Sequence, residues 1–422
     1  MTAEFDVLVV GAGPAGSTAA GLLAKAGHSV LVLEKEEFPR LHIGESLLPG
    51  GLPVLERLGI DPASDTFVYK SGAEFVCEAS GRRGVFEFRE SLPGCARHAW
   101  HVERSRFDQA LRDRAAVLGA DVRNGVTVVD AGTTPEHAFL KTRTETFRGR
   151  YLIDASGQSR LLARRQGTAQ PYHRFGNASV FTHYESLGDA AIQELGPGKN
   201  NIRIMLRPEG WGWIIPLPER RLSVGIVSKG KITPEELECG LLAGPLVQRL
   251  TVGTRRLETR IVGNYSYRNT APSGPRYTAI GDAACFLDPV FSSGVTLALR
   301  GGESVADRLA PALVAGREAA PDLLGEHDTA MDRAFRTFAG LIDRFYNTNF
   351  AETMFLGETL DVQMRRGVLS VLAGDVWRTG NPFQDMLLAA RREGNRVRSA
   401  ERGDAGPPDA GIPNEHGRHD ES

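Results

Sequence analysis

The feature that most constrains the fold is a glycine-rich turn near the N-terminus, Gly11-Ala-Gly-Pro-Ala-Gly16. The apolar run 5–10 before it predicts a buried parallel strand, and the small and aliphatic residues after it predict a helix. Gly11 permits the tight turn, Gly13 lets the backbone approach a pyrophosphate, and Gly16 lets the helix pack on the strand. The turn therefore predicts a dinucleotide held at the start of a helix.

The residues that follow this helix strengthen the prediction. Residues 29–33 predict a second strand, and Glu34 at its end is placed to accept a hydrogen bond from a ribose 2′-hydroxyl. A glycine motif alone is weak, since an ordinary glycine-rich turn is the alternative. Strand, turn, helix, strand and acid at this spacing together favour dinucleotide binding and an α/β fold with a Rossmann-like domain.

The composition of the chain excludes several functional classes. The chain has 422 residues, enough for two or three domains, and a formal charge of −2 without a basic block, which argues against a nucleic-acid partner. Its four cysteines are scattered, which argues against a zinc site and fits a reducing compartment. No basic leader precedes an apolar segment, and no apolar run approaches transmembrane length. We expect a cytoplasmic protein with no transmembrane segment.

A polar loop follows the second strand, at residues 37–49. Arg40 could meet phosphates there, and Gly44-Glu45-Ser46 could bring backbone and side-chain donors to a flavin. The alternative is a structural one, in which Ser46 caps the helix predicted around residues 54–58. The local pattern favours neither interpretation.

Two later strands carry side chains of chemical interest. Residues 67–76 alternate like a strand and, with 83–88, predict the start of a separate antiparallel sheet; Lys70 lies in the first run, where a solvated edge lysine is the ordinary interpretation. Trp211 and Trp213 lie two apart, on one face of a strand that ends at a proline, and an aromatic stripe in the core is the alternative to a functional role.

The stretch 277–299 is the second strongly punctuated part of the chain. A strand ends at Gly281-Asp282, where an acid can bind a ribityl or ribose hydroxyl. Ser292-Ser293-Gly294 opens the next helix, and its amides could hold a halide, a ring oxygen or another anion. A purely structural helix cap would use the same residues.

Taken together, these motifs resemble the flavin-dependent halogenases and the geranylgeranyl-reductase-like flavoproteins, within the p-hydroxybenzoate-hydroxylase-like FAD proteins. The matching blocks are Gly11–Gly16 with Glu34, Pro39-Arg40 with Gly44–Ser46, Arg104 with Phe107-Asp108, Asp154–Gly157, and Gly281-Asp282 with Asp288-Pro289. The resemblance implies FAD as the cofactor. The cofactor-binding residues it implies are Gly11, Gly13, Ala15, Gly16, Glu34, Lys35, Arg40, Ser46, Arg104, Asp282, Pro289 and Gly294.

The resemblance also implies the domain organisation. A discontinuous FAD-binding domain is expected over residues 1–66, 95–168 and 270–327, interleaved with an antiparallel substrate-binding sheet over 67–94 and 169–269. Helical patterns predict a C-terminal helical cap over 328–400. The composition of 401–422 predicts a disordered tail.

Three features point to the halogenase branch of this group. Trp211-x-Trp213-x-Ile215-Pro216 matches its W-x-W-x-I-P signature, residues 286–294 match F-x-x-P-x-x-S-x-G, and Lys70 before Ser-Gly-Ala-Glu-Phe resembles the strand with the family's catalytic lysine. The resemblance implies that reduced FAD from a separate flavin reductase, oxygen and a halide ion give hypohalous acid, which reaches Lys70. Trp211 and Trp213 would separate flavin from substrate, and Ser293 and Gly294 would bind the halide.

One departure from the family bears on the substrate. Tryptophan halogenases have a glutamate just before Ser-x-Gly, whereas residues 289–291 here are Pro-Val-Phe. The resemblance therefore implies a phenolic or pyrrolic substrate in secondary metabolism, such as antibiotic biosynthesis, either free or attached to a carrier protein. The alternative is an oxidoreductase of the same fold, which would hydroxylate an aromatic compound or reduce an isoprenoid double bond.

Overall fold

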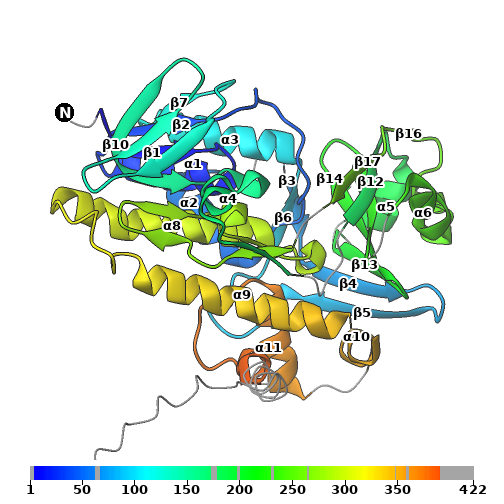
Figure 1. Cartoon of the computed structure of the whole chain (residues 1–422). Helices are drawn as coiled ribbons and strands as arrows, with labels where there is room; N and C mark the ends of the chain where they lie inside the picture. The colour runs from blue at the N-terminus through cyan, green and yellow to red at the C-terminus, as the bar shows by residue number, and fades with distance from the viewer. Residues whose placement is uncertain are drawn as a thin grey trace, which may run out of the picture.

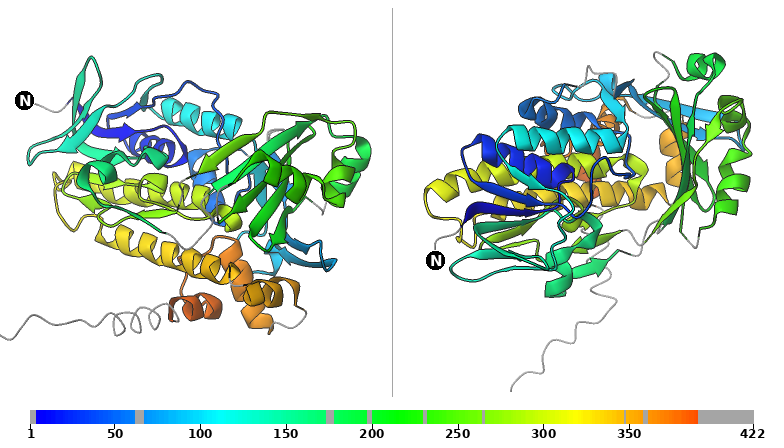
Figure 2. Two further views of the ribbon diagram at one scale, coloured as in Figure 1. Left: turned by 45° about the vertical axis from the view of Figure 1, so that its right-hand side comes forward. Right: turned by 90° about the horizontal axis from the view of Figure 1, so that it is seen from above.

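Two large β-sheets, a small three-stranded sheet, a two-stranded ribbon and several helices make up the described part of the computed structural model (Figure 1). The structure describes residues 4–61, 67–172, 178–196, 200–229, 232–263, 266–346, 348–357 and 361–389. The predicted tail at 401–422 lies outside the described residues. The same two sheets are seen from two further directions in Figure 2.

The first sheet contains the glycine-rich turn. Its strand order is β19-β20-β10-β1-β2-β7, in which β20, β10, β1, β2 and β7 run parallel, and the hairpin β8-β9 extends β10 in antiparallel fashion. The bounds are β1 Phe5–Val10, β2 Val30–Leu33, β7 Asp121–Arg123, β8 Asp130–Thr133, β9 Ala138–Lys141, β10 Thr146–Asp154, β19 Ser273–Gly274 and β20 Tyr277–Ala279. These strands confirm the Rossmann-like α/β class that the turn predicted.

The apolar strands of this sheet are buried on both faces, as continuous hydrophobic runs predict. Val7 and Val9 pack toward the helices α1, α2, α3 and α8, whereas Leu8 and Val10 pack toward the β8-β9 hairpin and α4. The bounds of these helices are α1 Pro14–Lys25, α2 Leu52–Leu58, α3 Arg104–Val117, α4 Leu161–Gln166 and α8 Ser293–Val314. This packing fixes the start of α1 at the carboxyl end of β1.

The second sheet has the order β16-β12-β15-β14-β13-β4-β5, with β17 beside β12. Its bounds are β4 Gly72–Cys77, β5 Arg82–Glu87, β12 Ala178–Glu185, β13 Ile202–Arg207, β14 Gly210–Leu217, β15 Arg221–Ser228, β16 Arg255–Arg256 and β17 Arg260–Gly263. The expectation of a purely antiparallel sheet is wrong at one place, because β13 pairs with β4 in parallel. These two strands come from distant parts of the chain, so no hairpin constrains their direction.

The outer face of this sheet is covered by α5, α6 and α7, and the other face packs on the C-terminal helices (Figure 1). The helix bounds are α5 Asp189–Leu195, α6 Pro234–Leu237, α7 Pro245–Leu250, α9 Gly325–Phe345, α10 Thr348–Leu356 and α11 Val362–Leu372. Trp211, Trp213 and Phe75 share one apolar cluster with Phe338 of α9 and Phe355 of α10. The C-terminal helices thus seal the sheet that carries the two tryptophans.

Three details differ from the strand predictions. The run 67–76 is interrupted at Ser71: β3 (Phe67–Lys70) pairs with β6 (Ala99–Val102) in a separate ribbon, and only β4 joins the second sheet. The apolar pattern of residues 121–129 also predicts a strand, but β7 ends at Arg123. A small third sheet, β11-β18-β21, contains parts of the segment assigned to the substrate sheet; its bounds are β11 Ala169–Pro171, β18 Tyr267–Asn269 and β21 Cys285–Phe286.

Candidate functional site

A cavity of about 820 Å³ lies between the glycine-rich turn, the loop after β2, the tryptophan strand β14 and the start of α8. Most of the predicted site residues line it: Gly11, Gly13, Ala15, Glu34, Lys35, Arg40, Ser46, Arg104, Trp211, Trp213, Asp282, Pro289, Ser293 and Gly294. Gly16 and Lys70 are not part of its lining. The fold therefore brings together residues that are almost 300 positions apart in the chain.

The glycines of the turn are required by close backbone contacts. Gly11 has a φ of +96°, and a Cβ there would lie 2.4 Å from the carbonyl oxygen of Ala155. A Cβ on Gly16 would lie 1.9 Å from the carbonyl oxygen of Gly11. Gly16 therefore acts by letting α1 pack against the turn, and the helix N-terminus then points its free N–H groups into the cavity.

Glu34 stabilises this turn and also lines the cavity. Its carboxylate accepts hydrogen bonds from the backbone N–H of Ala12 at 2.8 Å and from that of Glu36 at 3.0 Å. The neighbouring Lys35 is largely exposed, and its ammonium lies 3.8 Å from the Glu36 carboxylate. An acid at the end of β2 thus has the position expected for ribose binding.

Two arginines share one buried carboxylate beside the cavity. Arg104 donates to Asp108 through Nε at 2.8 Å and Nη2 at 2.9 Å, and its Nη1 donates to the carbonyl oxygen of Ile43 at 2.6 Å. Arg40 Nη2 lies 3.3 Å from Asp108, while Arg40 Nε lies 3.6 Å from the Glu36 carboxylate and has no hydrogen-bond partner. Arg104 thereby fixes the loop before Ser46, and Arg40 retains a donor for another group.

Asp282 lies on the same side of the cavity. Burial raises the pKa of its carboxyl to about 6, and the nearby Arg104 guanidinium opposes this rise. A carboxyl that remains partly protonated near neutral pH can both donate and accept hydrogen bonds. It is therefore suited to a hydroxyl-bearing ligand.

The structural alternative is wrong for Ser46, whereas Ser292 does stand at a helix N-cap. The N-cap of α2 is Gly51 and that of the preceding short helix is Leu48, so Ser46 caps neither; its Oγ is buried without a partner. Ser292 stands at the N-cap of α8 with a φ of 54° and makes no side-chain capping bond. A Cβ on Gly294 would meet nothing within 4 Å, so the start of α8 opens into space beside the cavity.

The two tryptophans belong both to the apolar core and to the wall of the cavity. Their rings lie 5.7 Å apart and both are buried, yet both line the cavity. Trp213 Nε1 donates to Ser223 Oγ at 3.0 Å, and Trp211 Nε1 donates to Asp288 at 3.0 Å. Paired indole N–H groups hold both rings in fixed orientations at the cavity wall.

Lys70 is buried, with 1% of its surface exposed, so the interpretation as a solvated edge lysine is wrong. Its Nζ donates to the carbonyl oxygen of Leu47 at 2.8 Å and lies 5.2 Å from the centroid of the Phe88 ring. Burial lowers the pKa of its amine to about 7. Because Ser46 lines the cavity and Leu47 contacts Lys70, a single strip of backbone separates the amine from the cavity.

Sequence reasoning missed several buried polar side chains of the site. Glu45 lines the cavity; its Oε1 lies 2.7 Å from His183 Nε2, and its Oε2 is buried without a partner. Asp288 accepts from Trp211, from the backbone N–H of Val290 and from Tyr346 at 2.5 Å. The motif that contains Asp288 could have indicated its role. Nothing in the sequence indicates that Glu45 pairs with His183, which lies 138 positions away.

The cavity fits FAD. Its volume lies within the range of small-molecule and cofactor sites. It offers the N-terminus of α1 for a pyrophosphate and a carboxylate at the end of β2 for a ribose. Glu45 Oε2 and Ser46 Oγ, two buried polar atoms without a hydrogen-bond partner, belong to residues of its wall, as expected where a polar ligand completes the hydrogen bonding.

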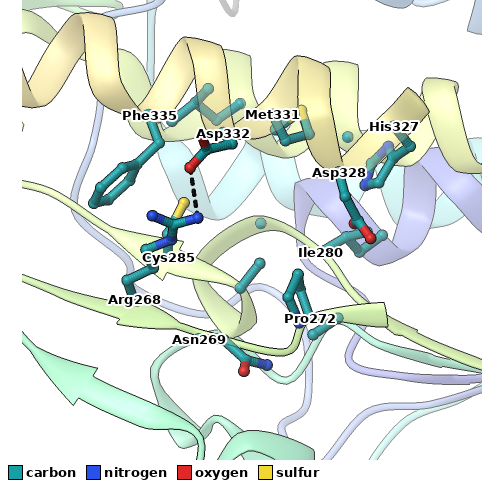
Figure 3. A pocket seen from close by; sticks show the side chains of 15 residues that line it. Arg268, Asn269, Pro272, Ile280, Cys285, His327, Asp328, Met331, Asp332 and Phe335 are labelled. Atoms are coloured by element: carbon teal, nitrogen blue, oxygen red, sulfur yellow. Dashed lines mark ion pairs between the residues drawn. The ribbon is translucent and has the colours of Figure 1, made fainter. Parts of the chain in front are cut away.

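A second, much smaller cavity is lined by Cys285 of β21 and by Met331 and Phe335 of α9 (Figure 3). It has a volume of about 50 Å³ and shares Ile280, Cys285 and Leu297 with the large cavity. The Arg268–Asp332 ion pair at 2.5 Å crosses its edge (Figure 3). Such a volume holds a few water molecules, so it is no chamber for an aromatic substrate.

No group of three or more His, Cys, Asp or Glu side chains in the described ranges could hold a metal ion. None of the helices in the described part of the chain is both long and apolar enough to cross a membrane.

Comparison with known proteins gives consistent matches. A family model described as tryptophan halogenase matches residues 6–97 and 89–365. A flavin-dependent halogenase of Armillaria mellea is 30% identical over 401 residues, which cover 87% of this chain and 79% of that protein. A 1H-pyrrole-2-carbonyl-[peptidyl-carrier protein] chlorinase of Pseudomonas fluorescens is 29% identical over 407 residues, covering 89% and 90%.

Solved structures agree with these matches. A flavoprotein/dehydrogenase from Cytophaga hutchinsonii superposes with a TM-score of 0.81 at 30% identity, covering 94% of this chain and 99% of that one. The flavin-dependent brominase Bmp2 superposes with a TM-score of 0.80 at 26% identity, covering 93% and 99%. The whole described fold thus recurs in flavoproteins.

Proposed function

The chain belongs to the tryptophan halogenase family of flavin-dependent halogenases, and from that premise we propose how its residues divide the reaction. The enzyme halogenates an electron-rich aromatic substrate with reduced FAD, oxygen and a halide ion. Reduced FAD, when bound, supplies two electrons to oxygen. The activated oxygen can then oxidise a halide ion to hypohalous acid. The observation that carries the proposal is Lys70, a buried amine one backbone strip away from the cavity.

The cavity residues hold the cofactor. Gly11, Gly13 and Ala15 let the pyrophosphate approach the start of α1, where N–H groups and the helix dipole favour an anion. Glu34 accepts from the ribose, and Lys35 and Arg40 supply positive charge near the phosphates. Gly16 contributes indirectly, by allowing the helix to pack on the turn.

The remaining cofactor contacts lie toward the tryptophans. Ser46 and Asp282 offer hydrogen bonds to the ribityl chain or the ring, and Arg104 positions the loop that carries Ser46. Pro289 closes the wall beside the start of α8. The backbone N–H groups of Ser293 and Gly294 bind the halide ion, a role supported by the open space at Gly294.

Trp211 and Trp213 keep the flavin side apart from the substrate side. Their hydrogen-bonded indoles form a rigid apolar wall, so the substrate cannot react directly at the flavin. Hypohalous acid can pass because it is small. Lys70 then either donates a hydrogen bond to it or carries the halogen as a haloamine.

The substrate is phenolic or pyrrolic rather than free tryptophan. Phe291 stands where tryptophan halogenases have a glutamate, and its ring packs on Phe345 at 5.6 Å and Phe355 at 6.0 Å. This apolar cluster offers no carboxylate to an indole N–H. The relative that acts on a pyrrole bound to a carrier protein supports a carrier-bound substrate for this chain as well.

Reduced flavin comes from a separate flavin reductase, since the sequence has no second glycine fingerprint for a nicotinamide cofactor. We place the reaction in the cytoplasm, where such reductases work. The four cysteines, all of them free, are consistent with this reducing compartment.

The test combines the purified protein with FAD, a flavin reductase, chloride or bromide, and a panel of phenols, pyrroles and carrier-bound aromatic groups. Mass spectrometry is expected to show a halogenated product. Lys70→Met is expected to bind and oxidise flavin normally but to give no product, whereas Lys25→Met, whose exposed amine also donates to a backbone carbonyl, retains activity. Product hydroxylated without regard to halide would overturn the proposal.

A further inference from the structure

The strip between the cavity and Lys70 is a third strand on the β3-β6 ribbon. Ser46 forms an antiparallel bridge with His101, Leu47 N donates to Trp100 O at 2.9 Å, and Val102 N donates to Glu45 O at 2.8 Å. One edge of this small sheet therefore faces the cavity through Ser46. The other edge carries Lys70 on β3.

Pairing places three polar side chains on one face of this sheet. Directly opposed residues in an antiparallel pair share a face, as do residues two apart along a strand. Ser46 opposes His101, and Lys70 opposes Ala99, two residues before His101. Burial agrees with this assignment, because His101 is fully buried while Tyr69, on the opposite face, is 47% exposed.

The hydrogen bond of His101 defines its tautomer. Nε2 lies 2.7 Å from the carbonyl oxygen of Asn200, which can only accept, so Nε2 carries the proton and Nδ1 carries the lone pair. Burial and the neighbouring Lys70 charge lower the pKa of His101 to about 3, which keeps the ring neutral. Nδ1 of His101 and Oγ of Ser46 are both buried without a partner.

The surroundings of these polar atoms are apolar. Ala99 on the same face, and Phe88 beneath Lys70, belong to the apolar cluster that contains Trp211 and Trp213. Unpaired polar atoms in such surroundings are costly unless a ligand completes them. Here Ser46 Oγ and His101 Nδ1 lie between the cavity wall and Lys70.

We propose that Ser46 and His101 form the polar passage from the flavin cavity to Lys70, and that His101 Nδ1 accepts the hydrogen bond of the hypohalous acid O–H while Lys70 donates to its oxygen. This inference rests on the proposed function. Ser46 is the first hydrogen-bonding group on the path, and His101 with Lys70 holds the acid where the substrate meets it.

The transfer balances with these groups alone. An electron pair of the aromatic ring forms the carbon–halogen bond, and the oxygen–halogen pair passes to oxygen. The oxygen takes a proton from the Lys70 ammonium and leaves as water. His101 Nδ1 takes the proton lost by the ring carbon and returns it to the Lys70 amine, so the sum is arene plus hypohalous acid giving haloarene plus water.

The test measures coupling rather than rate alone. His101→Gln keeps an N–H group for the Asn200 carbonyl but replaces the basic Nδ1 by an amide, whose oxygen is too weak a base to take up the proton of the ring carbon. With reductase-supplied FAD, bromide and a substrate that the native enzyme halogenates, the yield of product per oxygen consumed is expected to fall about tenfold. A soluble 1,3-diketone should trap the released hypohalite, while flavin oxidation stays within about twofold.

Two further variants sharpen the result. Ser46→Ala is expected to lower the same yield by a smaller factor, about threefold. The matched control is His327→Gln, since His327 is also buried, and its Nδ1 lies 3.1 Å from Ser304 Oγ, away from the ribbon. It should leave the yield and the trapped hypohalite unchanged. A native yield in His101→Gln overturns the passage.

A second readout needs neither flavin nor turnover. Imidazole ¹⁵N NMR of the flavin-free protein should show His101 neutral, with its proton on Nε2, from about pH 5 to 8. A proton on Nδ1, or a charged ring at about pH 6, overturns the proposal even if the Gln variant folds poorly. If the native protein yields neither product nor trapped hypohalite, the proposed function itself fails, and the passage with it.

Discussion

Replacement of Lys70 by methionine should make the protein more stable and abolish halogenation. The pKa of the amine is lowered by burial from its ordinary value of 10.5 to about 7. A displacement of about 3.5 units corresponds to about 5 kcal/mol of free energy of unfolding, at about 1.36 kcal/mol per unit. At low pH, burial of the protonated Lys70 amine lowers the free energy of unfolding by this amount.

The sign follows from proton binding. Below about pH 7 the amine is protonated in both states, and between about pH 7 and 10.5 only the unfolded chain binds the proton. The free energy of unfolding contributed by Lys70 therefore rises as the pH rises through this window. The electrostatic cost is about 4–5 kcal/mol at about pH 6.5 and about 1–2 kcal/mol at about pH 9.5.

Methionine removes this cost but leaves the carbonyl oxygen of Leu47 without its donor, which costs about 1–3 kcal/mol. Lys70→Met is thus expected to be about 2–3 kcal/mol more stable than the native protein at about pH 6.5, and the gain should shrink by about 3 kcal/mol at about pH 9.5. For a chain of this length that gain corresponds to about 2–3 °C in Tm.

The assay is urea or thermal unfolding of the native protein and the variant at both pH values, with flavin binding measured in parallel. Lys25→Met is the matched control, because its exposed amine also donates to a carbonyl, that of Arg57 at 3.1 Å. It should change the free energy of unfolding by less than about 0.5 kcal/mol at either pH. A Lys70→Met protein that gains no stability at the lower pH, or gains equally at both, refutes the argument.

Three other substitutions test neighbouring parts of the site. Burial raises the pKa of the Asp282 carboxyl to about 6, so the free energy of unfolding falls as the pH rises from about 4 to 6 and this carboxyl ionises. Asp282→Asn should therefore add up to about 3 kcal/mol to the free energy of unfolding at about pH 7.5. The same substitution should weaken FAD binding in a fluorescence titration. Gly16→Ala places a Cβ 1.9 Å from the Gly11 carbonyl oxygen, and should lower the free energy of unfolding by at least about 2 kcal/mol and abolish flavin retention on gel filtration. Ser223→Ala leaves the buried indole N–H of Trp213 unpaired, which should cost about 1–3 kcal/mol in urea unfolding.

The nucleotide half of the site was predictable because its rules are local. The order of β1, the turn, α1, β2 and Glu34 depends on hydrophobic runs, on the conformational freedom of Gly11 and on the close packing at Gly16, all within 34 residues. The starts of α2 and α8 were less certain, since Ser46 and Ser292 both satisfy a capping pattern, but α2 begins after Gly51, and Ser292 stands at the N-cap of α8 without a side-chain capping bond. Only the tertiary structure distinguishes a serine that caps from one that faces a ligand.

The environment of Lys70 could not be derived from its neighbours in sequence. The run 67–76 alternates as one strand, but the chain leaves the ribbon at Ser71 and enters the second sheet at Gly72, where a Cβ would lie 1.9 Å from the Phe86 carbonyl oxygen. Burial of the amine then depends on Leu47 and on β6, both distant in sequence. A strand pattern predicts which side chains share a face, but it does not predict what covers that face.

Asp288 shows why the two halves of the site act together. Its buried carboxylate accepts from Trp211 at 3.0 Å, from the backbone N–H of Val290 at 3.0 Å and from Tyr346 at 2.5 Å, so it joins the tryptophan wall, the loop before α8 and the end of α9. Loss of one of these hydrogen bonds would leave a buried polar group unsatisfied, which costs free energy. A shift of the C-terminal helices must therefore strain the wall and the start of α8 together. Asp288 thus links Trp211 of β14 to the loop before α8 and to Tyr346 at the end of α9, which explains an acid at a position that faces an indole.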